Sequence, residues 1–231
     1  MNFIEDLKWR GALNQVTDEA GLLEAMINDK IGAYVGTDPT APSLHLGHLI
    51  PFMVLKRFQN AGGKAVIIIG GGTGAIGDPR PTTERKLLSP EQLAANEQGI
   101  TAQVTKLFGA GDTQIVNNND WLGKLTLTDF LRDYGKLFSI NVMLKKDVVA
   151  SRLETGISFT EFTYQILQGI DFHELWRRHN VQLQIGGSDQ WGNITSGIDL
   201  IHAIEGNEAK AFGLTIPLMT DATGKKFGKS E

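Results

Sequence analysis

One continuous apolar run, AVIII at residues 65–69, does most to constrain how this chain can fold. The run has no alternation of polar and apolar residues, so it predicts a strand that is covered on both faces. Such strands occur in parallel sheets that carry helices on both sides. Glycines follow the run at once, which predicts a sharp turn where the strand ends.

Strand-like and helix-like segments alternate along the rest of the chain. Strands are predicted over residues 32–38, 64–72, 113–119 and 181–190. Helices are predicted over residues 46–63, 89–111, 126–139, 158–180 and 190–206. This alternation predicts an α/β fold built on a parallel sheet.

Two stretches indicate how the chain is organised. The helices between about 117 and 160 look less like sheet crossovers than the others, so we expect an inserted helical unit there. The chain ends on TGKKFGKSE, a glycine- and lysine-rich stretch typical of a loop. A chain that ends in a loop is expected to be part of a longer protein.

The amino-acid composition excludes or argues against several classes of function. The chain has no cysteine, which excludes disulfides, thiolate metal sites and a cysteine nucleophile. A net charge of −4 argues against a generic basic clamp for nucleic acid. We find neither a secretory signal nor an apolar stretch long enough to span a bilayer. We therefore expect a cytoplasmic protein that does not contact a membrane.

The stretch TDPTAPSLHLGHLIPF at residues 37–52 places His45 and His48 around Gly47. A zinc site needs a third ligand, and the other histidines show no ligand-like spacing, so no protein-bound metal is predicted. Two polar residues that face solvent at a helix start remain a possible interpretation. Because the pair follows a predicted strand and stands at a helix N-terminus, we favour a phosphate-binding site.

The glycine run GGGTGAIGDP at residues 70–79 contains the spacing G-x-G-x-x-G. This spacing matches the dinucleotide fingerprint, but the fingerprint should follow the first strand and open a helix. Here it follows a later strand and leads into a predicted loop, so a tight glycine turn is favoured. Asp78 at its end is a candidate functional carboxylate.

The predicted helix at residues 158–180 opens on Ser158-x-x-Glu161, a capping box. Tyr164, Gln168 and Asp171 follow at spacings that place them on one face. That stripe is either the solvent side of an amphipathic helix or a row of groups that bind a small polar ligand. The absence of lysine from the stripe favours the ligand.

Two further motifs carry candidate residues. The stretch QIGGSDQWGN repeats the pattern of strand, glycines and acid, with Gly187, Asp189 and Gln190 where the strand ends. The stretch KKFGKS carries Lys226 and Lys229. These lysines are either a solvated tail or cations that neutralise phosphate charge.

These pieces occur together, in this order, in one family. PTAPSLHLGH resembles the HIGH motif of class I aminoacyl-tRNA synthetases, and KFGKS resembles their KMSKS motif. YVGTDPTAPSLHLGHL, IGDP, ISFTEFTYQILQGIDF and LQIGGSDQWGN are similar to blocks of the bacterial tyrosyl-tRNA synthetases. The resemblance covers nearly the whole chain and implies a Rossmann-like parallel sheet flanked by helices. Residues 1–231 would form the catalytic nucleotide-binding domain, including a helical connective and dimer-interface insertion at about 117–160.

The resemblance also implies an activity and its partners. The family is a set of ligases that activate L-tyrosine with ATP, accompanied by Mg²⁺, to tyrosyl-adenylate and pyrophosphate, and then transfer tyrosine to tRNA(Tyr). A homodimer is implied as well. The C-terminal anticodon-binding and RNA-binding domains of the family are absent from these residues, so we expect activation but not full tRNA charging.

The family's site residues can be placed on this sequence. For tyrosine, the matching residues are Tyr34 and Asp171 at the phenol, Asp78, Tyr164 and Gln168 at the ammonium, and Gln190 at the carboxylate. For ATP, they are Gly36, Asp38, His45, Gly47, His48, Gly187, Asp189 and Lys229. The matching catalytic groups are Thr40, His45, Arg85, Lys226 and Lys229.

One loop departs from the family pattern. GDPRPTTERKLL lacks the lysine that many members carry there, and Arg80 is a candidate replacement beside Arg85. Two other functions stay open: a relative that activates tryptophan, and a non-catalytic binding module on the same fold.

Overall fold

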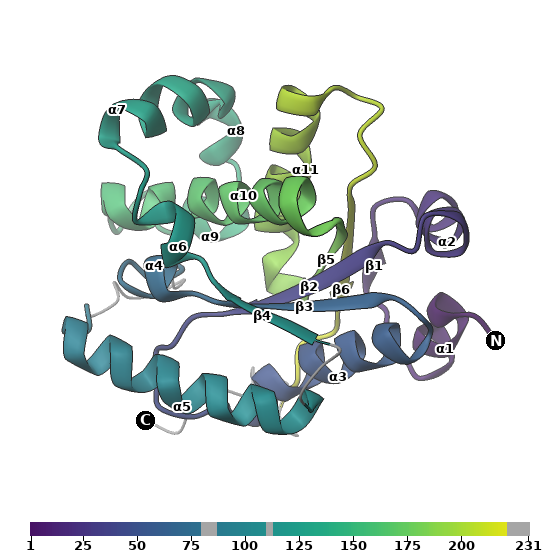
Figure 1. Cartoon of the computed structure of the whole chain (residues 1–231). Coiled ribbons are helices and arrows are strands. Elements are labelled where there is room, and N and C mark those ends of the chain that lie inside the picture. The colour runs from purple at the N-terminus through teal and green to yellow at the C-terminus, as the bar shows by residue number, and fades with distance from the viewer. Residues whose placement is uncertain (80–86, 110–112, 221–231) are drawn as a thin grey trace.

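The computed structural model describes residues 1–79, 87–109 and 113–220. A six-stranded sheet in the order β1-β6-β5-β2-β3-β4 forms its centre (Figure 1). Its strands are β1 Gln15–Val16, β2 Gly32–Thr37, β3 Lys64–Ile69, β4 Thr113–Asn117, β5 Val181–Gly187 and β6 Phe212–Ile216. All neighbouring strands run parallel except β1, which pairs antiparallel with β6 at one edge.

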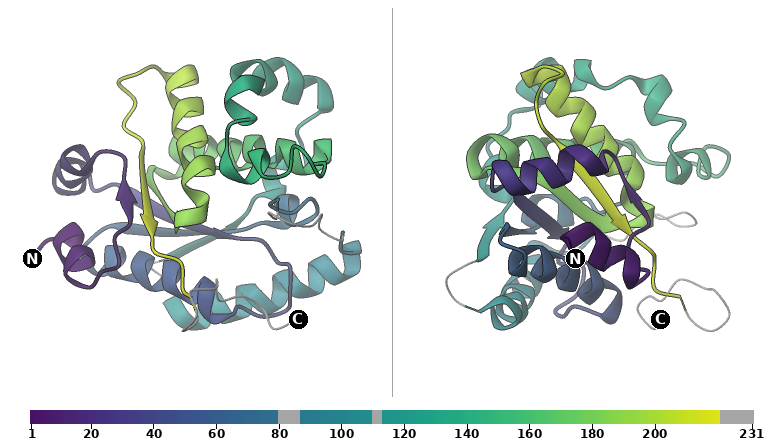
Figure 2. Two further views of the ribbon diagram at one scale, coloured as in Figure 1. Left: turned by 180° about the vertical axis from the view of Figure 1, so that it is seen from behind. Right: turned by 90° about the vertical axis from the view of Figure 1, so that its right-hand side faces the viewer.

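Helices cover both faces of the sheet. On one side lie α1 Phe3–Trp9, α3 Leu46–Asn60 and α5 Pro90–Phe108, and on the other lie α10 Phe159–His179 and α11 Trp191–Glu205 (Figures 1 and 2). Helix α2, Glu19–Asn28, lies beside the β1 end of the sheet. The fold is therefore three-layered, as the alternation of strands and helices predicts.

Strand β3 is covered on both faces, as its apolar run predicts. Ala65, Ile67 and Ile69 belong to the core cluster that packs against α3 and α5. Val66 and Ile68 belong to the opposite cluster, which packs against α10 and α11. Successive side chains of a strand point to opposite faces, so a continuous apolar run fills both cores.

Local signals fix the ends of the two longest helices. The N-cap residue of α5 is Ser89, which forms a capping box with Gln92. The N-cap residue of α10 is Ser158, whose hydroxyl accepts the Glu161 N–H, and its C-cap residue is Asn180 in the left-handed conformation (φ 55°). Asparagine tolerates this conformation better than most residues, so it ends a helix without glycine.

A string of short helical segments connects β4 to α10 and lies over α10 (Figure 1). The segments are α6 Asn119–Leu122, α7 Leu127–Asp129, η1 Phe130–Tyr134, η2 Gly135–Leu137, α8 Ile140–Met143 and α9 Asp147–Ala150. Their apolar side chains form a cluster with Ile166 and Ile170 of α10 and Leu200 of α11. We call residues 119–157 the insert.

Several details differ from the sequence-based expectations. The glycine run is not a plain turn, because Gly71–Gly74 form one helical turn, α4. The single helix predicted over 126–139 is broken into α7, a π-helical segment and a 3-10 turn. Strands β1 and β6 were not predicted; β1 spans only two residues, too few to produce a periodic pattern.

Candidate functional site

The candidate site lies where the strand order reverses. Strand β2 pairs with β3 on one side and with β5 on the other, so the chain runs outward in both directions from β2. In open parallel sheets such a switch point leaves a crevice beyond the carboxyl ends of the strands. Thr37, Ile69 and Gly187 end the three strands there. The predicted site residues that the structure describes come from these strands, from the segments that follow them, from the start of α3 and from α10.

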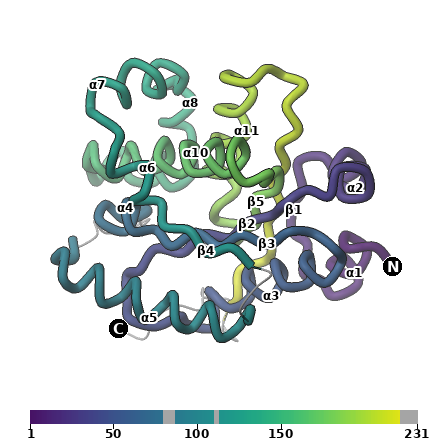
Figure 3. The backbone as a smooth tube through the Cα atoms, viewed as in Figure 1, coloured from purple at the N-terminus to yellow at the C-terminus, as the bar shows by residue number. Residues whose placement is uncertain are grey.

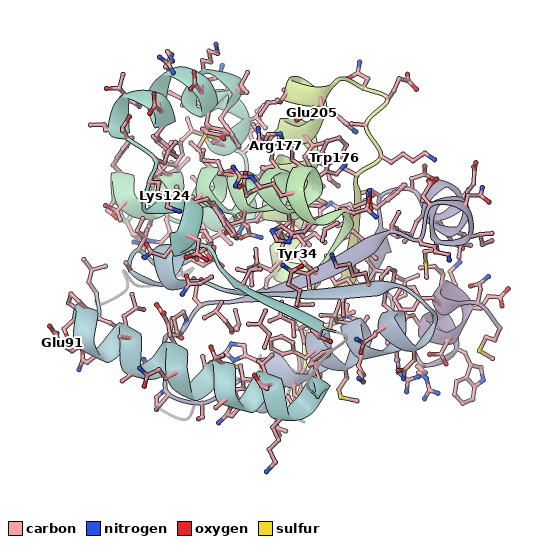
Figure 4. The ribbon with its side chains drawn as sticks, viewed as in Figure 1. Tyr34, Glu91, Lys124, Trp176, Arg177 and Glu205 are labelled. Carbon is pink, nitrogen blue, oxygen red and sulfur yellow. The ribbon has the colours of Figure 1, made fainter. Side chains whose placement is uncertain are left out.

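Tyr34 of β2 places a phenol beneath α10 (Figure 4). The side chain is 2% exposed, and its ring lies 5.4 Å from that of Phe172, centroid to centroid. The buried hydroxyl has no hydrogen-bond partner among the described residues. Burial, and next the nearby Asp171 carboxylate, raise the pKa of Tyr34 well above its usual value. A buried, unsatisfied hydroxyl is costly, so this one is suited to a polar ligand.

Asp171 of α10 is the acid beside this phenol. Its Oδ2 accepts a hydrogen bond from Asn118 Nδ2 at 2.9 Å, and its Oδ1 accepts one from Trp121 Nε1 at 2.8 Å. Burial raises the pKa of Asp171 to about 7, although both hydrogen bonds act in the opposite direction. The carboxyl is thus held in one orientation by two donors, one directly after β4 and one in the first segment of the insert.

A second acid, Asp38, lies in the same polar network. The Thr73 hydroxyl donates to Asp38 Oδ1 at 2.7 Å, and the Tyr164 hydroxyl donates to Asp38 Oδ2 at 2.9 Å. Asn118 Nδ2 donates to Thr73 Oγ1 at 2.8 Å and so joins Asp38 to Asp171. This network crosses the crevice from β2 to α10.

Asp78 forms the centre of a cluster of side-chain amides. Gln190 Nε2 donates to one of its oxygens at 3.0 Å, and Asn193 Nδ2 donates to the other at 3.2 Å. Gln168 Nε2 donates to Gln190 Oε1 at 3.2 Å, and Asn193 Nδ2 donates to Gln168 Oε1 at 3.0 Å. Burial raises the pKa of Tyr164 most, followed by the charge of Asp38 and then that of Asp78. The two carboxylates and the Tyr164 phenol therefore lie close to one another.

The polar stripe of α10 faces this crevice. Tyr164 is 7% exposed and Asp171 is 4% exposed, and Gln168 is half-buried. The alternative in which the stripe is the solvent side of an amphipathic helix is therefore wrong.

The two histidines stand at the start of α3. His45 is the N-cap residue, with an extended backbone, and His48 lies in the first turn. Their rings stack with centroids 3.7 Å apart and planes 23° apart. The first turn contains Leu46, Gly47, His48 and Leu49 and so no acid. The positive end of the helix dipole is thus not neutralised from within this turn, which favours an anion there.

The remaining predicted ATP residues lie on the strand ends and the loops after them. Gly36 is exposed on β2, and Thr40 follows in the next loop, where its N–H donates to Asp38 O at 2.8 Å. Gly187 ends β5, and Asp189 is exposed in the turn after it. A methyl group on Gly187 would approach Asp189 Oδ1 to 2.7 Å, so a side chain at this position would displace that carboxylate.

A sequence model of the family described as tRNA synthetases class I (W and Y) matches residues 26–231. This chain belongs to that family. The tyrosine–tRNA ligase of Leuconostoc citreum (strain KM20) is 90% identical over all 231 residues, which make up 56% of that protein. The tyrosine–tRNA ligase of Limosilactobacillus fermentum is 66% identical, and the matched part makes up 55% of it. The chain therefore spans about half the length of these curated relatives.

Solved structures of class I synthetases have the same fold. A C-terminally truncated mitochondrial tyrosyl-tRNA synthetase from Coccidioides posadasii superimposes with a TM-score of 0.84 at 35% identity, covering 98% of this chain and 70% of that one. The tyrosyl-tRNA synthetase of Archaeoglobus fulgidus, solved with L-tyrosine, gives 0.79 at 17% identity, covering 98% of this chain and 67% of that one. At 17% identity the likeness concerns the fold alone.

Four predicted residues of the synthetase signature fall outside the structure. Arg80, Arg85, Lys226 and Lys229 lie beyond the described residues. Among the residues that the structure describes, no group of three or more histidine, aspartate or glutamate side chains is arranged to hold a metal ion. None of the helices in the same part of the chain has both the length and the apolar character of a membrane span.

Four further residues of this synthetase-family site escaped the sequence analysis. Thr73, Asn118, Trp121 and Asn193 all donate to the predicted acids or their partners. Asn118 lies at the end of the strand predicted over residues 113–119, where a polar side chain is a candidate ligand. That position could have identified it. Asn193 lies within the quoted stretch QIGGSDQWGN, one helical turn after Gln190.

Proposed function

We propose that this chain activates L-tyrosine with ATP, forming tyrosyl-adenylate and pyrophosphate. The observation that carries the proposal is the buried Tyr34 hydroxyl, which has no partner in the described structure and lies beside Asp171. The phenol of a bound tyrosine can accept from Tyr34 and donate to Asp171, so both groups gain a partner. The two curated relatives are tyrosine–tRNA ligases, which supports the same substrate.

The other end of tyrosine matches the remaining network. Asp78 and the phenolic oxygen of Tyr164 are acceptors for the ammonium, and Gln168 adds an amide oxygen. Gln190 offers an amide to the carboxylate. A buried ammonium needs acceptors and at least one negative charge, and Asp78 supplies that charge.

The reaction needs alignment more than acid–base chemistry. The tyrosine carboxylate is already a nucleophile; it attacks the α-phosphorus of ATP, forming a C–O–P bond, and the bond to the pyrophosphate oxygen breaks. Negative charge grows on the leaving pyrophosphate, and groups that stabilise it there lower the barrier. We assign this role to Thr40, His45 and the N-terminus of α3, with Arg85, Lys226 and Lys229 as further cations.

The adenosine end of ATP is assigned to the exposed strand ends. Gly36, Gly47 and Gly187 allow close approach of the nucleotide, and His48 and Asp189 are its polar partners. We assign Asp38 to the same end of the nucleotide. ATP enters as its Mg²⁺ complex, so the ion arrives with the substrate.

Transfer of tyrosine to tRNA(Tyr) is the activity we propose for the full-length protein, in the cytoplasm, where tRNA is charged. The chain spans about half the length of its curated relatives, and we assign the activation step to these residues.

We also propose that the chain forms a homodimer through the insert. Large apolar side chains are exposed on the insert and at the start of α10. They are Leu127 (73%), Leu131 (53%), Ile140 (62%), Val142 (51%), Leu153 (51%) and Phe159 (71%). Exposed apolar side chains gathered in one region are typical of a protein interface.

Exchange of pyrophosphate into ATP tests the activation step. We expect exchange with the purified chain when tyrosine is added, and not when tryptophan or phenylalanine replaces it. Exchange with tryptophan alone would assign the chain to the tryptophan branch of the family. A folded chain that binds neither tyrosine nor ATP would point to a non-catalytic module.

A further inference from the structure

Helix α5 lies along the segment that joins β2 to α3. Figure 3 shows this segment, residues 38–44, running down from the sheet and across α5 before α3 begins. It carries Thr40 and leads directly into His45. It has no regular secondary structure of its own, so other parts of the molecule must fix its course.

Three residues of α5 contact this segment. Asn96 Nδ2 donates to Pro39 O at 2.9 Å, and Gln103 Oε1 accepts the Leu44 N–H at 2.9 Å. Between them, a methyl group placed on Gly99 would lie 2.4 Å from Pro42 O. The spacings of three and four residues place all three on one face of the helix.

The two side-chain amides form hydrogen bonds of opposite direction. Asn96 acts as a donor to a carbonyl, whereas Gln103 acts as an acceptor from an N–H. Asn96 is only 8% exposed, so its amide and the Pro39 carbonyl satisfy each other largely away from water. The two contacts hold the segment on both sides of Thr40, at Pro39 and at Leu44.

The close approach of the segment to α5 also explains why residue 99, in the interior of the helix, is glycine. Glycine in the interior of a helix is unfavourable compared with alanine. Backbone contact between the segment and α5 leaves no room for a side chain, because the atom that a Cβ would meet is a carbonyl oxygen and not the end of a flexible side chain.

We propose that the Asn96–Gly99–Gln103 face of α5 is a positioning surface for the phosphate end of the site: it fixes the segment that carries Thr40 and presents His45. This inference rests on the proposed function, because Thr40 and His45 are assigned there to the leaving pyrophosphate. None of the three α5 residues needs to touch a substrate. They act through the segment, so their loss should affect the chemical step more than tyrosine binding.

The test measures tyrosine-dependent pyrophosphate exchange and, separately, tyrosine affinity by calorimetry. We expect Asn96→Ala and Gln103→Ala each to lower kcat about tenfold, because small misplacements of catalytic groups are costly. The Kd for tyrosine should stay unchanged, since Tyr34 and Asp171 are held by other elements. Gln98→Ala is the matched control, because Gln98 is exposed on the same helix.

Exchange of amide for acid separates positioning from general packing. Gln103→Glu keeps an oxygen acceptor for the Leu44 N–H and should restore most of the rate lost in Gln103→Ala. Asn96→Asp loses its donor and places a carboxylate against the Pro39 carbonyl, so it should be at least as slow as Asn96→Ala. Gly99→Ala should lower kcat even though alanine favours the helix.

Each outcome decides something. If the wild type is active and Asn96→Ala and Gln103→Ala have unchanged rates, the inference is overturned. It is also overturned if these variants lose rate and tyrosine affinity equally. If the alanine variants do not fold, the Gln103→Glu and Asn96→Asp pair decides, and equal rates in the two would overturn it. A wild type without exchange refutes the proposed function itself, and this inference is then refuted with it.

Discussion

Asp171 shows how one side chain is tuned by opposing effects. Burial disfavours its charged form, and two donors, Asn118 and Trp121, favour it; the balance leaves a pKa of about 7. The free energy of unfolding should therefore fall as the pH rises from about 4 to about 7, because over this range the unfolded carboxyl ionises while the buried one keeps its proton. A bound tyrosine phenol would donate to this carboxylate and reduce that cost.

Tyrosine binding should depend on pH through Asp171. Because the ionised carboxylate accepts a stronger hydrogen bond, binding should tighten about tenfold between pH of about 5.5 and about 8.5, which corresponds to a drop of about one unit in the pKa on binding. Calorimetry across this range measures it. Asp171→Asn should bind weakly and lose the dependence, and an equal pH profile in the variant would assign the titration elsewhere.

Tyr34 should contribute to selectivity as well as to affinity. In Tyr34→Phe the substrate phenol loses one hydrogen-bond partner, a loss of about 1 kcal/mol. The Kd for tyrosine should rise several-fold while that for phenylalanine changes little. Unchanged tyrosine affinity and selectivity would show that the phenol does not bind there.

Helix α10 joins the insert to the candidate site. Its first turn carries Glu161, which is 2% exposed and faces Arg152 of the insert at 3.2 Å; the Arg152 Nε also donates to Gly156 O at 3.0 Å. The same helix carries Tyr164, Gln168 and Asp171 further on. The capping sequence at Ser158 predicted where this helix begins, whereas the partner of Glu161 lies in the insert and left no local signal.

Replacing Arg152 should destabilise the fold. Arg152→Met removes the cation that faces a buried carboxylate, and breaking such a pair costs about 3–5 kcal/mol. Chemical denaturation with urea measures the loss. The double variant Arg152→Met with Glu161→Met should recover much of it, and a double variant as unstable as the single one would contradict this explanation.

The site is assembled from segments far apart in the chain, and this decides how much of it could be predicted. Strands such as β3 and helices such as α10 follow from local periodicity and capping, and Tyr34, Asp78 and Asp171 follow from motifs. The bond from Asn118 to Asp171 joins residues 53 positions apart, and that from Tyr164 to Asp38 joins residues 126 apart. Such contacts depend on how strands and helices pack, which no local pattern encodes.

The proposed dimer depends on the exposed apolar surface of the insert and the start of α10. Sedimentation velocity at two concentrations should show a dimer that Phe159→Asp weakens, since a charge in an apolar interface is costly. Trp9→Asp is the matched control, because Trp9 is 72% exposed but lies on α1. A monomer at both concentrations would contradict the proposal.

A crystal structure of the chain with L-tyrosine would test where the substrate lies. The account predicts the phenol oxygen within hydrogen-bond distance of both Tyr34 Oη and an Asp171 carboxylate oxygen, with the ammonium beside Asp78 and Tyr164. Tyrosine bound in the reverse orientation, or outside this crevice, would contradict it.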